Sequence, residues 1–479
     1  MESERSLARN TLYSAISSAS NVLLIVLVIA AARLLGDESF GQFSFALALA
    51  SVFEMVIDLG LNTLTARNVA RDRSLARVYL PNILGWKLIL SVGAMGLLVL
   101  CANLLHQAPV ARTAAYILGG AIVLRSFKGT AHAFFQAYER FDLILLTSYV
   151  ERAAVLAFGI LALVLTRSLI AFAAVFALVR IPDLLFTYWL VNRNVARVQI
   201  GLRVDTVKKL QRSAIPFGAY AITAVVYSYL GTIVLSALES PQEVGWYSAG
   251  YKVYEGLTMF PAVLGAVLLP RLSRLFTSDR ERHTTLSVRV LKYLALSTLP
   301  ILISFGILAE DLVVLLYGGD FLPATSVLRI LLGAATLMFL NVVLNAILIS
   351  ANREKAVLWS AAGGLLAMGA ANLILIPRYG MTGAAVSSVA GEVCILAALL
   401  ANMRRYIFRV PAYSLTWRPA LACISAGAVL FLSPAWASAA SVLLFVTIYG
   451  LLLVLLRAFD AQDWSVIRNF VFSRSIAPR

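Results

Sequence analysis

Charged side chains recur inside long apolar stretches of this sequence. A charge at the centre of a bilayer costs about 2.5–3.5 kcal/mol on insertion scales, so each such side chain must face protein or water. Arg125 and Lys128 are spaced i, i+3 and therefore share one helical face. The other basic residues of this kind are Arg152, Arg180 and Lys252. Because guanidinium groups match phosphate oxygens, these residues favour a phosphate or pyrophosphate ligand.

An alternative is that some of these cations form structural ion pairs. Three of them have an acidic neighbour in the same predicted helix, namely Glu151, Asp183 and Glu255 for Arg152, Arg180 and Lys252 respectively. Arg125 and Lys128 have no local acidic neighbour, which favours ligand binding for this pair. We therefore expect all five basic residues to bind substrate. Structural pairing stays open for Arg152, Arg180 and Lys252.

Polar residues in the first two apolar stretches add three further candidates. Asn21 belongs to a polar stripe in the first stretch and is a sixth expected substrate-binding residue. Glu54 and Asp58 are spaced i, i+4 and lie on one helical face of the second stretch. Two such carboxylates could couple transport to a proton or sodium ion, or could pair with the basic residues described above.

The composition indicates a polytopic α-helical membrane protein. Of 479 residues, 61% are hydrophobic and only 13% are charged, whereas soluble proteins contain about 45–50% apolar and about 25% charged residues. The apolar stretches are long and do not alternate, which excludes a transmembrane β-barrel. The net charge of +16 is typical of the basic cytoplasmic loops of membrane proteins, so we expect no nucleic-acid partner. With three scattered cysteines and three scattered histidines, we expect no metal site or other cofactor.

Length counting predicts about fourteen membrane spans, since one span needs about 20 apolar residues. Residues 1–200 are expected to form an N-terminal lobe with spans one to six, and residues 201–410 a C-terminal lobe with spans seven to twelve. Residues 411–457 would add spans thirteen and fourteen, and residues 458–479 an amphipathic cytoplasmic tail. Gly36 and Gly380 belong to short expected turns between spans. The connectors after spans two, six, eight, ten and twelve are basic, so both termini are expected to be cytoplasmic.

A repeat relates the two predicted lobes. At one constant offset, Gly41 matches Gly245, Ser44 matches Ser248 and Arg67 matches Arg271. Because the offset spans an even number of predicted helices, both copies have the same orientation. We therefore expect two parallel six-helix repeats with a substrate path between two lobes.

Six short motifs occur in an order and spacing that resemble a known transporter family. They are Ala32-Arg33-Leu34-Leu35-Gly36, Phe40-Gly41-Gln42-Phe43-Ser44, Ile57-Asp58-Leu59-Gly60-Leu61, Val244-Gly245-Trp246-Tyr247-Ser248-Ala249, Leu268-Leu269-Pro270-Arg271-Leu272-Ser273 and Ile376-Pro377-Arg378-Tyr379-Gly380. The pattern resembles the flippases of lipid-linked oligosaccharides, of the O-antigen flippase type. These proteins belong with the multidrug and toxin extruders in the MOP superfamily.

The resemblance implies a V-shaped, two-lobed fold that works by alternating access. The implied function is transfer of an undecaprenyl-pyrophosphate-linked oligosaccharide, an O-antigen or exopolysaccharide repeat unit, from the cytoplasmic to the outer leaflet of the bacterial inner membrane. Membrane lipids and the polysaccharide polymerase and export machinery are the implied partners.

Two other functions are compatible with the chain. A cation-coupled multidrug exporter of the same fold is one, although the excess of basic side chains at mid-depth argues against its cationic cargo. A membrane-embedded glycan polymerase or ligase is the other, and such enzymes are expected to carry acid/base groups on a sizeable outer loop. The predicted outer connectors are too short for one, so we expect a transporter and not an enzyme.

Overall fold

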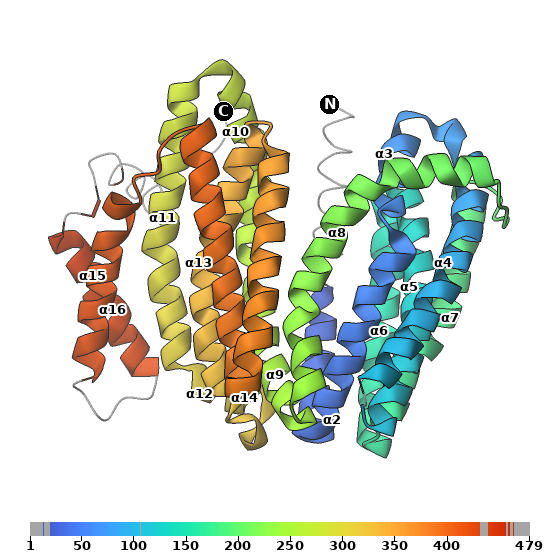
Figure 1. Cartoon of the computed structure of the whole chain (residues 1–479), viewed down its shortest axis with the longest axis horizontal. Helices are drawn as coiled ribbons and strands as arrows, with labels where there is room; N and C mark the ends of the chain where they lie inside the picture. The colour runs from blue at the N-terminus through green and yellow to red at the C-terminus, as the bar shows by residue number, and fades with distance from the viewer. Residues whose placement is uncertain are drawn as a thin grey trace, which may run out of the picture. The chain divides into compact units, whose positions relative to one another are not determined.

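A computed structural model of the chain is built from α-helices (Figure 1). It describes Tyr13, residues 20–105, 107–431 and 439–456, and also Ala458, Phe459 and Asp463. Over these residues the regular elements are all helical. Eight of the helices are long and apolar enough to cross a membrane. The predicted class, a polytopic α-helical membrane protein, is therefore confirmed.

The chain forms two compact units. Within the described residues, the first comprises residues up to Ala249 with Val313–Ala324 and Met368–Ser387. The second comprises Gly250–Leu312, Thr325–Ala367 and the residues from Ser388 onward. In order, the elements are α2 (Asn21–Asp58), α3 (Leu61–Arg71), η1 (Arg73–Leu75), α4 (Ala76–Leu104), α5 (Pro109–Ala137), α6 (Phe141–Thr166), α7 (Leu169–Asn194), α8 (Val204–Leu238), α9 (Pro241–Leu257), α10 (Met259–Ser278), α11 (Arg280–Ile307), α12 (Ala309–Tyr317), η2 (Gly319–Phe321), α13 (Ala324–Ser350), α14 (Glu354–Tyr406), α15 (Ala412–Phe431) and α16 (Ala439–Leu455).

Helix α5 is at the centre of the first unit and packs against α2, α3, α4, α6 and α7. Its buried face begins with Ala111, Ala114, Ala115 and Leu118, the spacing of one helical face. Small side chains on such a face let neighbouring backbones approach closely inside a membrane. The close packing brings polar groups of six helices, α5 and its five neighbours, near one another.

Two glycines interrupt helices where the sequence predicts turns. Gly36 inside α2 has φ 79°, and Gly380 inside α14 has φ 54°, conformations that other residues rarely adopt. The carboxylate of Glu243 accepts a hydrogen bond at 2.9 Å from the amide of Met381, next to the second interruption. Helix α14 has 53 residues, which is more than twice the roughly 20 residues that one span needs, and it therefore contains two predicted spans.

The two copies of the repeat touch through related residues of α2 and α9, both within the first unit. A Cβ atom on Gly41 would overlap the carbonyl oxygen of Pro241. A Cβ atom on Gly245 would overlap the carbonyl oxygen of Asp37. The offset that relates Gly41 to Gly245 also relates Asp37 to Pro241, so the two contacts are equivalent. This reciprocity is typical of two-fold symmetry and confirms the repeat.

In the second unit, α15 and α16 pack against α11 (Figure 1). The hydroxyl of Tyr449 donates a hydrogen bond at 2.8 Å to the carbonyl oxygen of Leu296. The carboxylate of Asp463 binds the Lys292 ammonium at 2.5 Å and the Tyr293 hydroxyl at 2.6 Å. The two extra C-terminal helices expected from the sequence are therefore present. Most of the predicted amphipathic tail lies outside the described residues.

The number of spans and the lobe boundaries stay predictions. Helix α16 has 17 residues, and the second and eighth predicted spans are each interrupted, between α2 and α3 and between α9 and α10. These features, together with the two predicted spans joined in α14, account for part of the difference between the eight described helices that meet a simple length rule and the fourteen or so predicted spans.

Candidate functional site

The charged residues of the first unit gather where α2 ends. Asp58 is the last residue of α2, and Leu59 and Gly60 follow with φ 42° and 83°. A Cβ atom on Gly60 would overlap the amide nitrogen of Gly218, so α8 passes close to this break. The break interrupts the predicted second span and redirects the chain into α3. It leaves polar groups of α2 and α3 facing α4 and α5.

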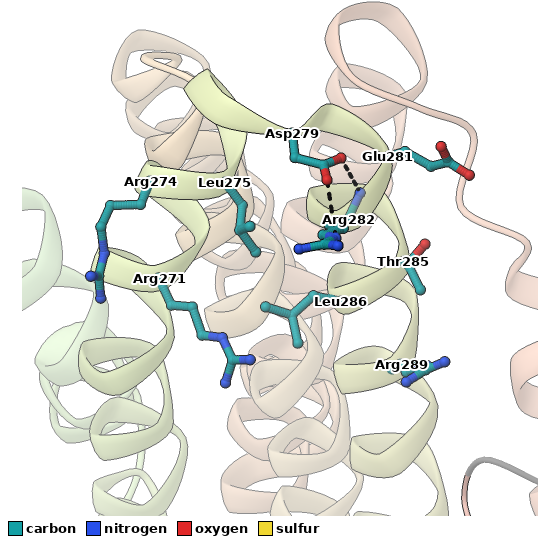
Figure 2. Close-up of a pocket in the computed structure, with 9 residues that line it drawn as sticks. All are labelled: Arg271, Arg274, Leu275, Asp279, Glu281, Arg282, Thr285, Leu286 and Arg289. Atoms are coloured by element: carbon teal, nitrogen blue, oxygen red, sulfur yellow. Dashed lines mark hydrogen bonds and ion pairs between the residues drawn. The ribbon is translucent and has the colours of Figure 1, made fainter.

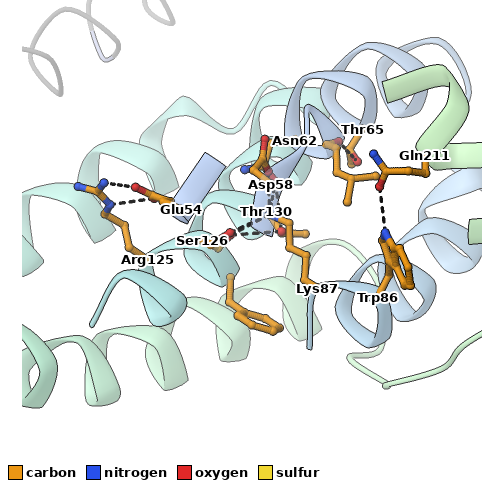
Figure 3. A network of polar contacts seen from close by, with 12 residues as sticks. Glu54, Asp58, Asn62, Thr65, Trp86, Lys87, Arg125, Ser126, Thr130 and Gln211 are labelled. Carbon is orange, nitrogen blue, oxygen red and sulfur yellow. Dashed lines mark hydrogen bonds and ion pairs between the residues drawn. The ribbon is translucent and has the colours of Figure 1, made fainter. Parts of the chain in front are cut away.

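Lys87 of α4 is the most deeply buried cation of this region, with 0% of its side chain exposed (Figure 3). Its ammonium lies 2.8 Å from Asp58 Oδ1 and 3.0 Å from Asn62 Oδ1. It also donates to the carbonyl oxygen of Ser126 at 3.1 Å. The hydroxyl of Thr130 donates to the same Asn62 oxygen at 3.2 Å. Lys87 is absent from the predicted set, although a lysine within an apolar stretch is itself a signal of function.

Arg125 of α5 pairs with Glu54 of α2 (Figure 3). The guanidinium donates through Nε at 2.9 Å and also through Nη2, so both carboxylate oxygens are engaged. The Arg125 side chain is nevertheless 41% exposed. Because a guanidinium has five donors, this geometry leaves donors on Nη1 for another ligand. Glu54 lies on another helix, so this is the pairing of an α2 carboxylate with a basic residue that the sequence left open.

Lys128, one turn further along α5, lies in a closed four-residue cluster. Its ammonium binds Glu151 at 2.7 Å and Asp183 at 2.8 Å, and only 6% of its side chain is exposed. Arg180 donates from Nε to the other oxygen of Glu151 at 3.0 Å and also lies over the ring of Phe176. Lys128 has no acidic neighbour in its own helix, and its two partners come from α6 and α7. Arg180 pairs with Glu151 rather than with Asp183, its neighbour in the sequence.

The remaining predicted residues occupy separate environments. Arg152 donates a hydrogen bond to the hydroxyl of Ser20, just before α2. Lys252 binds Glu255 at 2.6 Å, the local pair that the sequence suggests. The side chain of Asn21 lies outside the described residues. Four of the six predicted substrate-binding residues therefore belong to the first unit, and Lys252 belongs to the second.

Charge balance decides what this polar region can do. Lys87, Arg125, Lys128 and Arg180 pair with four carboxylates, so these residues form a nearly neutral region rather than a strongly cationic one. Those carboxylates are Glu54, Asp58, Glu151 and Asp183. Arg152 bonds to the Ser20 hydroxyl instead. In the described part of the chain, one Asp183 oxygen is buried without a hydrogen-bond partner. The cluster combines an accessible guanidinium with closed ion pairs that hold the helices in register.

Neutralising Glu151 should loosen this cluster. We expect Glu151→Gln to lower the free energy of unfolding by about 1.5–3 kcal/mol, because Lys128 and Arg180 lose charge-assisted hydrogen bonds to one carboxylate. Thermal unfolding of the purified protein in detergent would measure the change. Glu255→Gln is the matched control. The Glu255 side chain is 48% exposed, so this substitution should lower the free energy of unfolding only slightly. Equal losses in the two variants would contradict the role given to Glu151.

Similar folds occur among solved membrane transporters. The lipid II flippase MurJ, in an inward closed conformation, superposes with a TM-score of 0.72 at 13% identity. That likeness covers 96% of this chain and 100% of the flippase. An inward-facing multidrug resistance MATE family transporter of the MOP superfamily superposes with a TM-score of 0.62 at 15% identity, over 83% of this chain and 98% of the transporter. The chain therefore has the fold of MOP-type transporters.

Sequence comparison points to the same group. The chain is 23% identical over 375 residues to a Shigella flexneri protein assigned as an O-antigen transporter, covering 74% of this chain and 87% of that protein. The family described as polysaccharide biosynthesis protein matches residues 7–276, more than half of the chain. This multi-pass membrane protein therefore belongs to the polysaccharide biosynthesis protein family.

Proposed function

We propose that this protein is a flippase that moves a lipid-linked oligosaccharide across the membrane. Its family, the O-antigen transporter relative and the flippase of similar fold support this function. The proposed cargo is an undecaprenyl-pyrophosphate-linked saccharide, as the family resemblance implies, and basic side chains would bind its pyrophosphate. The proposed direction is from the cytoplasmic to the outer leaflet of a bacterial inner membrane, by alternating access, with both termini cytoplasmic.

The partly exposed side chain of Arg125 is the observation that carries the proposal. Arg125 is the seventeenth of 29 residues in α5 and therefore lies near the middle of that span. Its side chain is 41% exposed, whereas those of Lys128 and Arg180 are 6% and 9% exposed. A charge kept accessible at this depth indicates an aqueous path. We assign headgroup binding to Arg125 and Arg152, and positioning of the helices to Lys128 and Arg180.

The role proposed for Glu54 and Asp58 follows from their pairing. Glu54 is bound by Arg125 and Asp58 by Lys87 at 2.8 Å, so a transported cation would have to replace a basic side chain. A phosphate that bound Arg125 would compete with Glu54 for the same donors. Proton or sodium coupling at these two carboxylates stays a prediction. Substrate phosphate that displaced Glu54 from Arg125 would free the Glu54 carboxylate to bind such a cation.

Reconstitution tests the function itself. Purified protein in liposomes that contain a lipid-linked oligosaccharide should make inner-leaflet glycan accessible to a membrane-impermeant reagent faster than protein-free liposomes do. A multidrug exporter would instead move cationic dyes and leave the glycan lipid in place. Dye transport without glycan exposure would therefore replace the proposed function.

A charge-neutral double variant tests the site. We expect Glu54→Gln with Arg125→Gln to lower flipping at least about tenfold, because a charge-assisted hydrogen bond to phosphate contributes about 1.5–3 kcal/mol. The two amides can still bond to each other, so the fold should survive, and thermal unfolding would verify this. Unchanged flipping by the folded double variant would mean that the pair is structural. The flippase function itself would then still stand.

A further inference from the structure

A basic cavity of the second unit lies at the hairpin between α10 and α11. It has a volume of about 1010 Å³ and contains the arginines Arg271, Arg274, Arg282 and Arg289 (Figure 2). Figure 2 shows the side chains of Arg271 and Arg282 directed toward the space between the two helices. The polar region of the first unit contributes no residue to this cavity.

The acidic residues at the cavity do not neutralise it. Asp279 accepts a hydrogen bond from the amide of Arg282 at 2.9 Å, which caps α11, and pairs with the Arg282 guanidinium at 3.1 Å. Glu281 is exposed and lies on the outer side of the helix in Figure 2. Among the described residues, Arg271, Arg274 and Arg289 have no ion pair or hydrogen bond from their side chains. Three guanidinium groups are therefore available to an anion.

The first copy of the repeat uses its related arginine differently. Arg67, which the repeat relates to Arg271, lies 5.1 Å from the centre of the Phe217 ring. Its Nε also donates to the side-chain oxygen of Asn68 at 3.1 Å. Arg271 therefore has surroundings that differ from those of its repeat-related residue.

The position of the cavity relative to the apolar part of α11 indicates that the anion belongs to a membrane lipid. Residues 290–307 of α11 form a mainly apolar stretch that is about 27 Å long at the rise of an α-helix. This length matches the hydrocarbon core of a bilayer, about 30 Å. Arg289 directly precedes the stretch, and Arg282 lies two turns further out. Arg289 is therefore expected at the level of lipid phosphates, and Arg282 lies further out on the same side.

We propose that this cavity binds the phosphate headgroup of an anionic membrane lipid. Guanidinium groups bind phosphate oxygens through paired donors, and basic residues beside a membrane span contribute about 1 kcal/mol each to binding of anionic lipid. The basic connectors predict that this hairpin faces the cytoplasm, so the lipid comes from that leaflet. The proposal does not rest on the flippase function, because it concerns a resident lipid and not the cargo.

Lipid titration of the purified full chain tests the proposal. Delipidated protein in neutral detergent would be titrated with phosphatidylglycerol or phosphatidylcholine, and bound lipid counted by native mass spectrometry. We expect a clear preference for phosphatidylglycerol. Arg271→Gln with Arg289→Gln should weaken its binding about thirty-fold, the factor that about 1 kcal/mol per arginine gives for two.

A matched double variant separates this site from general surface charge. Arg280 and Arg353 do not line the cavity, and each stacks on an aromatic ring, at 4.5 Å and 4.3 Å from its centre. Arg280→Gln with Arg353→Gln removes the same charge and should leave lipid binding within about twofold of the original protein. Equal weakening by both double variants, or none by the cavity variant, would overturn the proposal.

Competition with inorganic pyrophosphate distinguishes a lipid-binding site from a site for soluble anions. We expect it to displace phosphatidylglycerol only weakly, because the acyl chains hold the lipid beside the apolar part of α11. Complete displacement at equal affinity would identify a site for soluble phosphates and would overturn the assignment to a lipid. Thermal unfolding of both double variants would show that they are folded.

Discussion

Replacing Lys87 with methionine is expected to lower the free energy of unfolding by about 3–5 kcal/mol, the usual cost of removing one partner of a buried ion pair. The Lys87 side chain is fully buried, and its ammonium is the cation nearest Asp58, at 2.8 Å. It also joins Asn62 of α3 to Ser126 of α5. Methionine fills a similar volume but supplies no donor. A large drop in the thermal unfolding midpoint in detergent would be the direct evidence.

Removing both charges provides the control for this experiment. Asp58→Asn combined with Lys87→Met leaves no unpaired carboxylate, so it should recover most of the lost stability. The difference between the single and double variants gives the coupling free energy of the two residues. If the double variant is as unstable as Lys87→Met alone, the loss comes from packing and not from the ion pair.

Adding a side chain at the two-fold contact is expected to disrupt folding. A Cβ atom on Gly41 would overlap a carbonyl oxygen of Pro241, and main-chain atoms cannot move away as a flexible side chain can. We expect Gly41→Val to destabilise the protein by more than about 3 kcal/mol, the upper end for overpacked cores. Gly245→Val should have a similar effect, since its Cβ would overlap the carbonyl oxygen of Asp37. Yield of folded protein after membrane extraction would measure both.

Gly96 of α4 offers a matched control for these substitutions. A Cβ atom there would meet nothing within 4 Å, and its backbone is helical. Gly96→Ala should stabilise the helix by up to about 1 kcal/mol, because alanine has the higher helix propensity. Gly41→Ala, in contrast, should already reduce the yield. Normal yield of the Gly41 variants would show that α2 and α9 do not pack as closely as described.

Local chemistry in the sequence was sufficient to predict the class of the protein and several of its turns. Apolar runs of span length require helices in a membrane, because a bilayer offers no hydrogen-bond partners to an open backbone. Gly36 and Gly380 occur where the chain needs positive φ, and a turn is predicted at each. The repeat was also readable, since it needs only matching residue types at one offset.

Ion-pair partners on other helices could not be identified in the same way, although the local pair of Lys252 with Glu255 could. Helical periodicity shows which residues share a face, but not which neighbouring helix that face meets. Arg125 and Glu54 are far apart in the sequence and meet only because α2 and α5 pack together. Glu151 and Arg152, adjacent in the sequence, point in different directions around α6, so local pairing is unfavourable. Glu151 instead binds Lys128 and Arg180 from two other helices.

Residue type and apolar run length are local properties, so they were enough to predict charges inside membrane helices. Tertiary structure decided which of those charges are neutralised and which stay accessible. It buried Lys87, which the sequence interpretation missed, and left Arg125 partly exposed. The physical reason is that exposure and pairing depend on contacts between helices far apart in the chain, which no local pattern encodes.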